Sequence, residues 1–463
     1  MDRLPWSRFH WLVVIALGVT WALDGLEVTI VGALGPRLQD PGSLGLSPAD
    51  IGALASAYLV GAVLGALGFG WLTDRYGRKL IFFTTLAIYV AGVALSAFAW
   101  DFWSLALFRV ITGIGIGGEY AAINSAIDEL VPARLRGRVA LIVNGSFWAG
   151  AAVGSFASVI LLDPSWFALD LGWRIGFAIG AGLGLLILFT RRFVPESPRW
   201  LACHDRVEEG ERVTAEIERR VEAETGDKLP PASGRIAIHP QKTFGLGPIF
   251  ASMLTDYRGR SALVLLLMIA QAFLYNAIFF SYGLILTKFH GVSEQHVGLY
   301  LVPFAIGNVI GPIVLGPLFD TVGRRKMIFS TYLVSGVLLA ITGYFFAIGA
   351  LDATTETIAW CVIFFFASAA ASSAYLTASE VFPLEVRALA IAAFYAIGTG
   401  VGGVAAPYLF GVLIGGGQPW PIFWGYVGAA VLMIVAGTAA LFYGVDAEGK
   451  SLEDVAAPLS KAR

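Results

Sequence analysis

Four ionisable residues lie inside long apolar stretches of the sequence, away from the ends of those stretches. They are Asp24 and Glu27 in one stretch, and Arg109 and Glu119 in another. A charge inside a membrane span is costly, so such residues usually face a partner or a water-filled cavity. Asp24 and Glu27 are three residues apart and share one face of a helix. We expect both carboxylates to reach Arg109, with Glu119 deeper in the membrane.

Carboxylates next to an arginine in an apolar medium can carry protons. A low dielectric raises the pKa of a carboxyl group, and a nearby guanidinium lowers it again. An acid whose arginine partner moves can therefore take up and release a proton. We predict that Asp24 is the principal proton carrier, followed by Glu27, and that Arg109 and Glu119 complete the coupling group. The alternative is a buried ion network that only orients the two helices.

The composition indicates a membrane protein. Of the 463 residues, 57% are hydrophobic and 14% are charged, whereas about 25% of a soluble chain is charged. An ordinary soluble enzyme is therefore excluded. The net charge is −2 and no charged tail is present, so we expect no nucleic acid partner. The two cysteines, Cys203 and Cys361, lack metal-binding or redox spacing, and we expect no disulfide, metal ion or cofactor.

Apolar runs of about 20 residues predict twelve membrane-spanning helices. The expected spans are 11–35, 49–72, 80–99, 103–127, 138–162, 173–191, 261–287, 296–318, 327–349, 358–380, 388–414 and 421–443. An even number places both termini on one side. All but four of the 31 Lys and Arg residues fall on that side, the exceptions being Arg37, Arg109, Arg174 and Lys288. The positive-inside rule then predicts a multi-pass protein of the cytoplasmic membrane with both termini in the cytoplasm.

The chain divides into two halves of six spans. Residues 1–191 and 261–445 hold the spans, and a polar linker at 192–260 separates them, with a cytoplasmic tail at 446–463. Within the linker, His204–Gly226 has the charge spacing of a helix. We interpret the linker as a solvated connection whose helices rest against the ends of the spans.

The second half repeats motifs of the first. The stretch GWLTDRYGRK at 70–79 recurs as GPLFDTVGRR at 316–325, and the residues Glu129, Pro132 and Arg136 recur as Glu380, Pro383 and Arg387. Each copy follows the equivalent span, which indicates two parallel structural repeats.

These motifs resemble those of the major facilitator superfamily, whose loop signature is GxxxDRxGR, and the resemblance extends from about Trp11 to Tyr443. The segments PESPR at 195–199 and EGKSLE at 448–453 are similar to signatures of the sugar-porter branch. The resemblance implies an all-α membrane protein of twelve transmembrane helices. These form two six-helix bundles related by internal pseudo-symmetry, with a helical cytoplasmic loop between them. Such proteins work by alternating access to a site near the midplane.

The resemblance also gives the charged residues at the cytoplasmic helix ends a function. We predict that they pair across the two bundles when the inner side is closed, and that the pairs break when it opens. These candidate gate residues are Asp74, Arg75, Arg78, Glu129, Arg136, Glu196, Arg199, Asp320, Arg324, Glu380 and Arg387. Because single exposed pairs are weak, a gate needs the whole network. The alternative is that the arginines only anchor the helix ends.

Two further likenesses concern coupling. In proton-linked sugar porters a carboxylate of span 1 and the arginine of span 4 form the coupling pair, which Asp24 and Arg109 match. The stretch DGLE at 24–27 resembles the DGxD pattern of aromatic-acid and other metabolite:proton symporters. GGEY at 117–120 is similar to the same group.

The substrate site is expected to lie mainly in the second bundle. Gln271 and Asn276 match a Gln and the Asn of the sugar-porter pattern in span 7, and Tyr275 lies between them. Asn144 and Tyr375 occupy positions where sugar porters carry a Gln and a Trp. Hydrogen bonds between helices are the alternative role for each residue. Other sugar-porter residues of spans 7 and 10 are replaced, so the resemblance does not extend to a hexose substrate.

Together these features predict a secondary active transporter that carries a small organic metabolite with protons. The metabolite is an aromatic or other organic acid, or a sugar-like compound, and the lipid bilayer is the other partner of a monomeric chain. An uncoupled facilitator or exchanger is the main alternative, and a transporter-like sensor is less favoured. We expect no enzymatic activity, because the sequence offers no constellation of nucleophile, base and metal.

Overall fold

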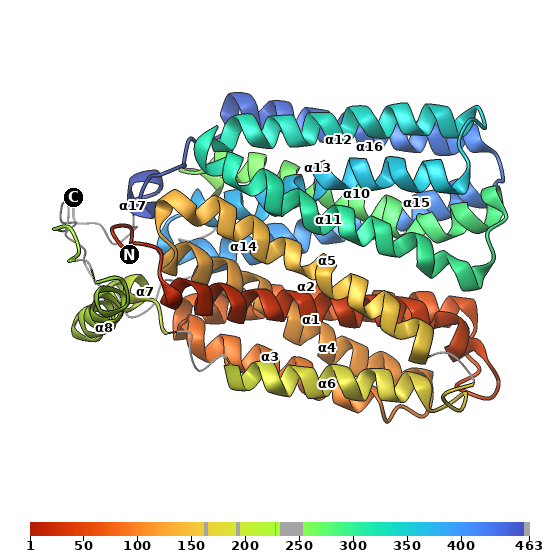
Figure 1. The fold of residues 1–463 in the computed structure, drawn as a ribbon, viewed down its shortest axis with the longest axis horizontal. Coiled ribbons are helices and arrows are strands. Elements are labelled where there is room, and N and C mark those ends of the chain that lie inside the picture. The colour runs from red at the N-terminus through yellow and green to blue at the C-terminus, as the bar shows by residue number, and fades with distance from the viewer. Residues whose placement is uncertain (162–164, 191–194, 227, 232–252, 458–463) are drawn as a thin grey trace.

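The protein is a stack of long helices that run in nearly the same direction (Figure 1). The computed structural model describes residues 1–161, 165–190, 195–226, 228–231 and 253–457. The first half forms α1 (Arg8–Gln39), α2 (Pro48–Tyr76), α3 (Arg78–Ser96), α4 (Phe102–Leu130), α5 (Arg136–Leu161) and α6 (Gly172–Thr190). The second half forms α10 (Arg258–His290), α11 (Glu294–Thr321), α12 (Arg324–Ala347), α13 (Ala353–Glu380), α14 (Arg387–Gly398), α15 (Val404–Gly415) and α16 (Pro419–Tyr443).

The twelve predicted spans are confirmed by these helices. A π-helical turn, Thr399–Gly403, joins α14 to α15, which together make one span. Among the described residues, eleven spans have the length and apolar composition to cross a membrane, and α6, with 19 residues, is the twelfth.

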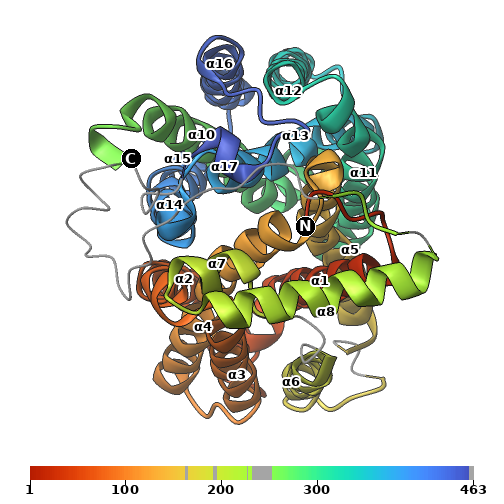
Figure 2. The ribbon, with the colours of Figure 1, turned by 90° about the vertical axis from the view of Figure 1, so that its left-hand side faces the viewer.

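The helices form two bundles, α1 to α6 and α10 to α16 (Figures 1 and 2). At one end lie the N-terminus, α7 (Pro198–Cys203), α8 (Val207–Thr225) and α17 (Leu452–Val455). We call this the linker end. The linker helix predicted from the sequence is confirmed as α8, which lies across the first bundle in Figure 2 and buries Ile217 and Val221.

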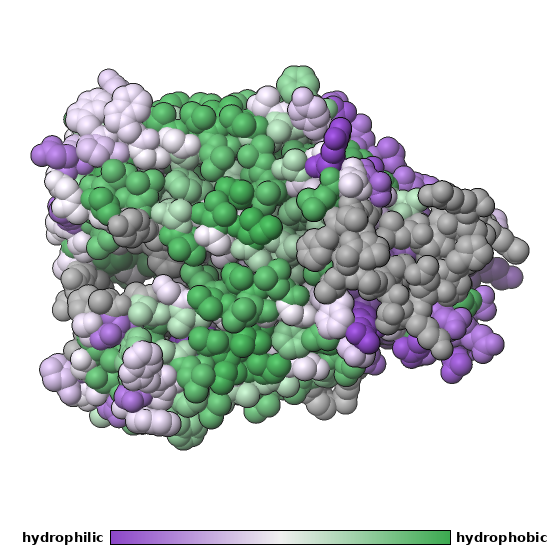
Figure 3. Space-filling model, turned by 180° about the vertical axis from the view of Figure 1, so that it is seen from behind, coloured by the Kyte–Doolittle hydropathy of each residue, from purple (hydrophilic) through white to green (hydrophobic). Residues whose placement is uncertain are grey.

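The outer surface of the bundles is apolar. Large hydrophobic side chains such as Trp103, Phe156 and Leu185 are more than half exposed. Figure 3 shows a broad hydrophobic band across the middle of one face, with hydrophilic residues gathered toward its two ends. A helix bundle that is apolar on both its inner and outer faces belongs in a lipid bilayer. The chain is therefore a multi-pass membrane protein.

The repeated glycine-containing motif makes the same turn in each bundle. Gly77 links α2 to α3 with φ of +98°, and Gly323 links α11 to α12 with φ of +111°. Side chains other than glycine rarely adopt such angles. A Cβ atom at Gly77 would also lie 2.4 Å from Oε2 of Glu196, and one at Gly323 would lie 2.8 Å from Oε1 of Glu448. The motif therefore requires glycine for both the turn and the close carboxylate.

The two bundles contact each other along two equivalent helix pairs. α2 packs against α14, and α5 packs against α11. Counting spans within each half, these are the second and fifth spans in both cases. The pairing therefore obeys the pseudo-symmetry of the repeats, and it leaves a central space between the bundles where α1, α4, α5, α10 and α13 meet.

Candidate functional site

Asp24 lies among aromatic side chains inside the first bundle. Its side chain is 1% exposed, and it accepts hydrogen bonds from the hydroxyls of Tyr58 on α2 and Tyr120 on α4, each at 2.9 Å. Both donors are neutral. Within the described part of the chain, Asp24 has no ion-pair partner, so its protonation breaks no ion pair.

Glu27 takes the buried arginine. Nη1 of Arg109 donates a hydrogen bond to Oε1 of Glu27, and both side chains are 3% exposed. The guanidinium of Arg109 lies over the ring of Tyr58, with Cζ 4.6 Å from the ring centroid. We expected both carboxylates to reach Arg109, and the structure corrects this expectation for Asp24. Asp24 lies about one helical turn from Glu27, and its hydrogen-bond partner on α4 is Tyr120 instead of Arg109.

Glu119 is the fourth buried charge of the first bundle. Its side chain is 0% exposed, and it lies on α4 next to Tyr120, within electrostatic range of Asp24. Asp24 therefore has both Glu27 and Glu119 within electrostatic range, and the order of the three acids along the bundle stays a prediction. A role for Glu119 in proton transfer stays a prediction.

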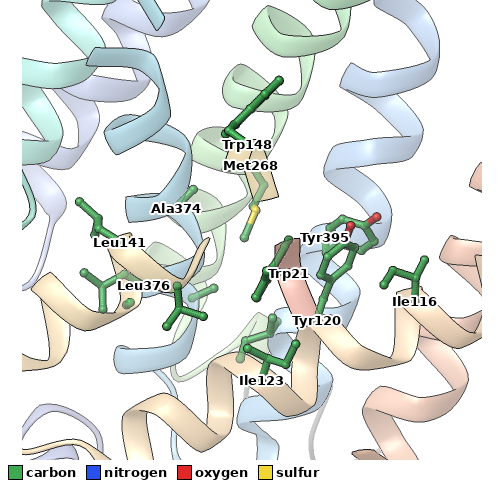
Figure 4. Packing of buried hydrophobic residues seen from close by; sticks show 14 of the residues in the cluster. Trp21, Ile116, Tyr120, Ile123, Leu141, Trp148, Met268, Ala374, Leu376 and Tyr395 are labelled. Carbon is green, nitrogen blue, oxygen red and sulfur yellow. The ribbon is translucent and has the colours of Figure 1, made fainter. Parts of the chain in front are cut away.

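A cavity of about 170 Å³ lies between the two bundles. Its walls carry rings, amides and hydroxyls from Trp21, Tyr120, Asn144, Phe147, Trp148, Gln271, Tyr275, Ser368, Ala371, Ser372 and Tyr375. Trp21 stacks on Tyr120 with ring centroids 4.6 Å apart, and Trp148 stacks on Tyr275 at 5.6 Å. In Figure 4, Trp21 and Tyr120 lie side by side with Tyr395 from α14. None of the described residues that line the cavity is charged.

Four of the five predicted substrate residues line this cavity. Asn144 donates to Oδ1 of Asn124 at 3.2 Å, while its own Oδ1 is buried and makes no hydrogen bond within the described residues. Tyr275 donates to Asn308 at 2.8 Å. Gln271 makes no hydrogen bond to any described residue, which leaves its amide available to the cavity. Tyr375 completes the four and contacts the rings of Trp21 and Tyr120.

Asn276 is the fifth predicted residue, and it lies away from the cavity. Its Nδ2 donates to the carbonyl oxygen of Ala272 at 2.7 Å. The same amide packs against Gly403, where a Cβ atom would lie 3.2 Å from Nδ2. One position along a helix turns a side chain by about 100°, so Asn276 faces the π-helical turn while Tyr275 faces the cavity. The expected substrate contact of Asn276 is therefore corrected to a helix-packing contact.

At the linker end, Asp74 joins the two bundles. Its carboxylate accepts hydrogen bonds from the backbone N–H groups of Ala388 and Leu389, at 3.4 and 2.9 Å, and so caps the first turn of α14. A carboxylate at a helix N-terminus also interacts favourably with the helix dipole. Arg78 lies 3.3 Å from Asp74 and 2.9 Å from Glu129.

The equivalent residues of the second half make the same arrangement in the opposite direction. Asp320 accepts from the N–H groups of Gly137 and Arg138, at 2.9 and 2.7 Å, in the first turn of α5. Arg324 lies 2.9 Å from Asp320 and donates twice to Glu380, at 2.9 and 3.0 Å.

Two ion pairs link the bundles directly at this end. Arg387 lies 3.4 Å from Glu129, and Arg136 lies 3.7 Å from Glu380. Each pair joins the arginine of one copy of the repeated Glu, Pro and Arg motif to the glutamate of the other copy. The side chains of all four residues are almost fully buried, so the linker end is closed in this structure.

The linker and the tail add carboxylates to the network. Glu196 accepts from the N–H groups of Arg78 and Lys79, and burial raises the pKa of its carboxyl group. Arg199 donates to Glu453 of α17 at 2.7 Å. Burial alone would raise the pKa of Glu453, but the Arg199 ion pair outweighs it and holds that pKa below its usual range.

Arg75 is the candidate gate residue that the structure places outside the network. Its guanidinium lies 5.2 Å from the ring of Trp71 and 5.4 Å from that of Tyr76, on the exposed side of α2. Asp74 and Arg78 face the second bundle, and the neighbouring position 75 is turned away from it by the helix. Arg75 is thus a surface residue beside aromatic rings.

The family of the chain follows from a comparison of its whole length. The model of the sugar (and other) transporter family matches residues 34–457. The chain belongs to this family. It is a transporter of the major facilitator superfamily, and not an enzyme.

Relatives with known names are distant but cover most of the chain. The niacin transporter NiaP of Acinetobacter baylyi is 28% identical over 98% of this chain and 98% of that protein. The 4-hydroxybenzoate transporter PcaK of Pseudomonas putida is 27% identical over 86% of this chain and 85% of that protein. A solved structure of the proton:xylose symporter XylE is 18% identical, covers 96% of this chain and 98% of that one, and superposes with a TM-score of 0.79, which shows the shared fold.

Several site residues of this transporter were not found from the sequence. Trp21, Trp148, Ser368 and Ser372 line the cavity, and Asp128 is buried at the linker end near Arg136 and Arg387. Helical spacing could have indicated two of these cavity residues, because Trp21 is three residues before Asp24 and Trp148 is four residues after Asn144. Nothing in the sequence shows that the helix face with Trp21 and the helix face with Trp148 line the same cavity. The described residues hold no cluster of His, Cys, Asp and Glu arranged for a metal ion.

Proposed function

We propose that this transporter carries a small aromatic acid, or a closely similar organic metabolite, together with protons across the cytoplasmic membrane. Asp24 is the principal proton carrier in this proposal. Arg109 stays paired with Glu27, and the cavity between the bundles binds the substrate. The linker end lies in the cytoplasm, as the excess of Lys and Arg on that side indicates.

The hydrogen bonding of Asp24 is the observation that carries the proposal. Asp24 is buried and accepts only from tyrosine hydroxyls within the described chain, whereas Glu27 pairs with Arg109. Protonation of Glu27 would leave a buried guanidinium without its counter-charge, which is strongly unfavourable. Protonation of Asp24 removes a buried charge and leaves both tyrosine hydroxyls able to rotate to new acceptors. The proton is therefore taken up more readily at Asp24 than at Glu27.

The cavity supports a ring-shaped substrate of small size. An engineered protein cavity of about 150 Å³ holds one benzene molecule, and the cavity here is about 170 Å³. Two stacked aromatic pairs form parts of its wall, and Gln271, Asn144 and the two serines supply hydrogen-bonding groups. The relatives that carry niacin and 4-hydroxybenzoate transport single-ring acids by name.

The charged network at the linker end is the proposed inner gate. Asp74 and Asp320 each cap a helix of the opposite bundle, and the Glu129–Arg387 and Arg136–Glu380 pairs lie beside these caps. Opening toward the cytoplasm separates all of these contacts. The paired side chains are buried, so each must be hydrated or find a new partner when the pairs separate, and this stabilises the closed state.

Uptake by the purified chain in proteoliposomes tests the proposal. With labelled nicotinate or 4-hydroxybenzoate, an inward-directed proton gradient is expected to drive accumulation by the natural chain. Asp24→Asn should abolish gradient-driven accumulation but retain exchange of labelled for unlabelled substrate. Asp256→Asn changes an exposed aspartate near the linker end and serves as the matched control, with uptake unchanged.

Each other outcome contradicts a defined part of the proposal. Accumulation that ignores the gradient in the natural chain indicates a facilitator or exchanger. Gradient-driven accumulation that survives in Asp24→Asn moves the proton to another acid. Ligand binding without any flux indicates a sensor.

A further inference from the structure

Tyr120 is the side chain that contacts both the buried acid and the substrate cavity. Its hydroxyl donates to Oδ2 of Asp24 at 2.9 Å, and its ring forms part of the cavity wall. The same ring stacks on Trp21 at 4.6 Å and lies 4.5 Å from the ring of Tyr395, which belongs to the second bundle. Tyr120 therefore contacts the acid, the cavity and the opposite bundle at once.

The hydroxyl of a tyrosine has one proton to donate. While Asp24 is ionised, this proton is held in a hydrogen bond to a charged acceptor, which is among the stronger hydrogen bonds in proteins. Once Asp24 is protonated, its carboxyl group is a weaker acceptor and has a proton of its own to donate. The Tyr120 hydroxyl is then free to rotate about its C–O bond and donate elsewhere.

We propose that Tyr120 couples the protonation of Asp24 to substrate binding, because its hydroxyl donates a hydrogen bond to Asp24 when the acid is charged and to the substrate when the acid is neutral. This inference rests on the proposed function. The ligand it favours is one with an anionic or strongly accepting group, such as a carboxylate, on a flat ring that stacks on Trp21. Such a group gains a donor in a cavity whose described walls carry no cation.

The surroundings of Asp24 single out Tyr120 for this role. The titratable groups that interact with Asp24 are Glu27 on α1, Tyr58 on α2, Tyr89 on α3, Glu119 and Tyr120 on α4, Tyr375 on α13 and Tyr395 on α14. Arg109 on α4 acts on Glu27, Tyr58 and Tyr89. Tyr58 makes the same hydrogen bond to Asp24 but does not line the cavity, and its ring lies under Arg109. Tyr375 lines the cavity but makes no hydrogen bond to Asp24 in this structure.

Tyr58 therefore provides a matched control for Tyr120. Tyr58→Phe and Tyr120→Phe each remove one donor from Asp24, and of these two tyrosines only Tyr120 also lines the cavity. The affinity of the purified full chain for nicotinate and for 4-hydroxybenzoate is measured by calorimetry from about pH 6 to about pH 8.5, where aromatic carboxylic acids stay ionised. Thermal unfolding of each variant reports whether it is folded.

The expected result is a loss of pH dependence in one variant alone. In the natural chain and in Tyr58→Phe, the dissociation constant should rise roughly tenfold or more across this range, the size expected for one hydrogen bond to a charged group. In Tyr120→Phe it should change less than about twofold, because the transferable donor is gone. Tyr120→Leu also lacks the hydroxyl and must behave in the same way.

The failures of the two proposals are distinguishable. A natural chain whose affinity is independent of pH, and whose uptake ignores the gradient, overturns the proposed function. A natural chain with pH-dependent affinity, matched by the same dependence in either Tyr120 variant, overturns only the role of Tyr120. Equal loss in Tyr58→Phe overturns it as well, because removal of any donor to Asp24 would then suffice.

Discussion

The two bundles are alike at the linker end and different in the middle of the membrane. At the linker end, Asp74 and Asp320 cap helices of opposite bundles, and each lies next to an arginine paired with a glutamate. In the middle, the first bundle buries an ion pair and two further acids, while the second presents Gln271, Tyr275 and serines to the cavity. The charged network of the linker end therefore occurs in both copies of the repeat, whereas the middle of the two bundles differs.

The difference agrees with the proposed division of labour, in which the first bundle binds protons and the second contributes most to substrate recognition. A gate must open and close at the same places in both bundles, so its residues occur in both copies of the repeat. Proton binding needs buried charge, and substrate recognition in an uncharged cavity needs rings and amides, which are different environments. Tyr120 and Tyr395 touch at the boundary between the two.

The largest expected effect comes from removing the cation of the first bundle. Arg109→Gln leaves the buried carboxylate of Glu27 without its counter-charge, and such a loss typically costs about 3–5 kcal/mol of stability. Thermal unfolding in detergent measures it against Gln271→Ala, the matched change in the second bundle, which should cost about 1 kcal/mol or less. The double variant Glu27→Gln with Arg109→Gln should recover most of the loss.

Equal stability of Arg109→Gln and Gln271→Ala would contradict this contrast. It would mean that the ion pair of the first bundle is hydrated or dispensable, and that the two middles differ in sequence alone.

A smaller effect is expected at the proposed gate, where the two bundles are alike. Asp74→Asn and Asp320→Asn each weaken two hydrogen bonds from helix N-terminal N–H groups to a charged acceptor across the bundles. Each should shift the equilibrium toward the state open at the linker end by roughly tenfold. Labelling of a cysteine introduced into the cavity wall, with a reagent added on the linker side, measures the shift.

Similar labelling rates are expected in the two variants, and both should be well above the rate of the natural chain. A strong increase in one variant with none in the other would show that the repeated caps are not equivalent. An Arg75→Ala variant should leave the rate unchanged, because Arg75 lies outside the network.

The fold can be predicted from the sequence because a membrane helix satisfies its own backbone hydrogen bonds and needs only a long apolar run. The repeat then fixed which ends correspond, and ten of the eleven gate candidates lie in the observed network. The prediction that Arg75 belongs to the network was wrong, because consecutive residues of a motif point in directions about 100° apart on a helix. Asn276 was misplaced for the same reason, one position from Tyr275.

Contacts between distant helices were harder to predict. Helical rise separates Asp24 from Glu27 by about one turn, but it does not show which acid faces Arg109. Tyr58 and Tyr120 lie on other helices, and no spacing within α1 indicates that their hydroxyls reach Asp24. The cavity wall combines faces from both bundles, so it becomes visible only once the bundles are placed together.

The most direct test of the division of labour counts protons as the ligand binds. Calorimetry of 4-hydroxybenzoate binding in two buffers of different ionisation enthalpy gives the number of protons taken up per ligand. We expect net proton uptake in the natural chain, none in Asp24→Asn, and unchanged uptake with weaker affinity in Gln271→Ala. Uptake that persists in Asp24→Asn, or that disappears in Gln271→Ala, would contradict the assignment of proton binding to the first bundle.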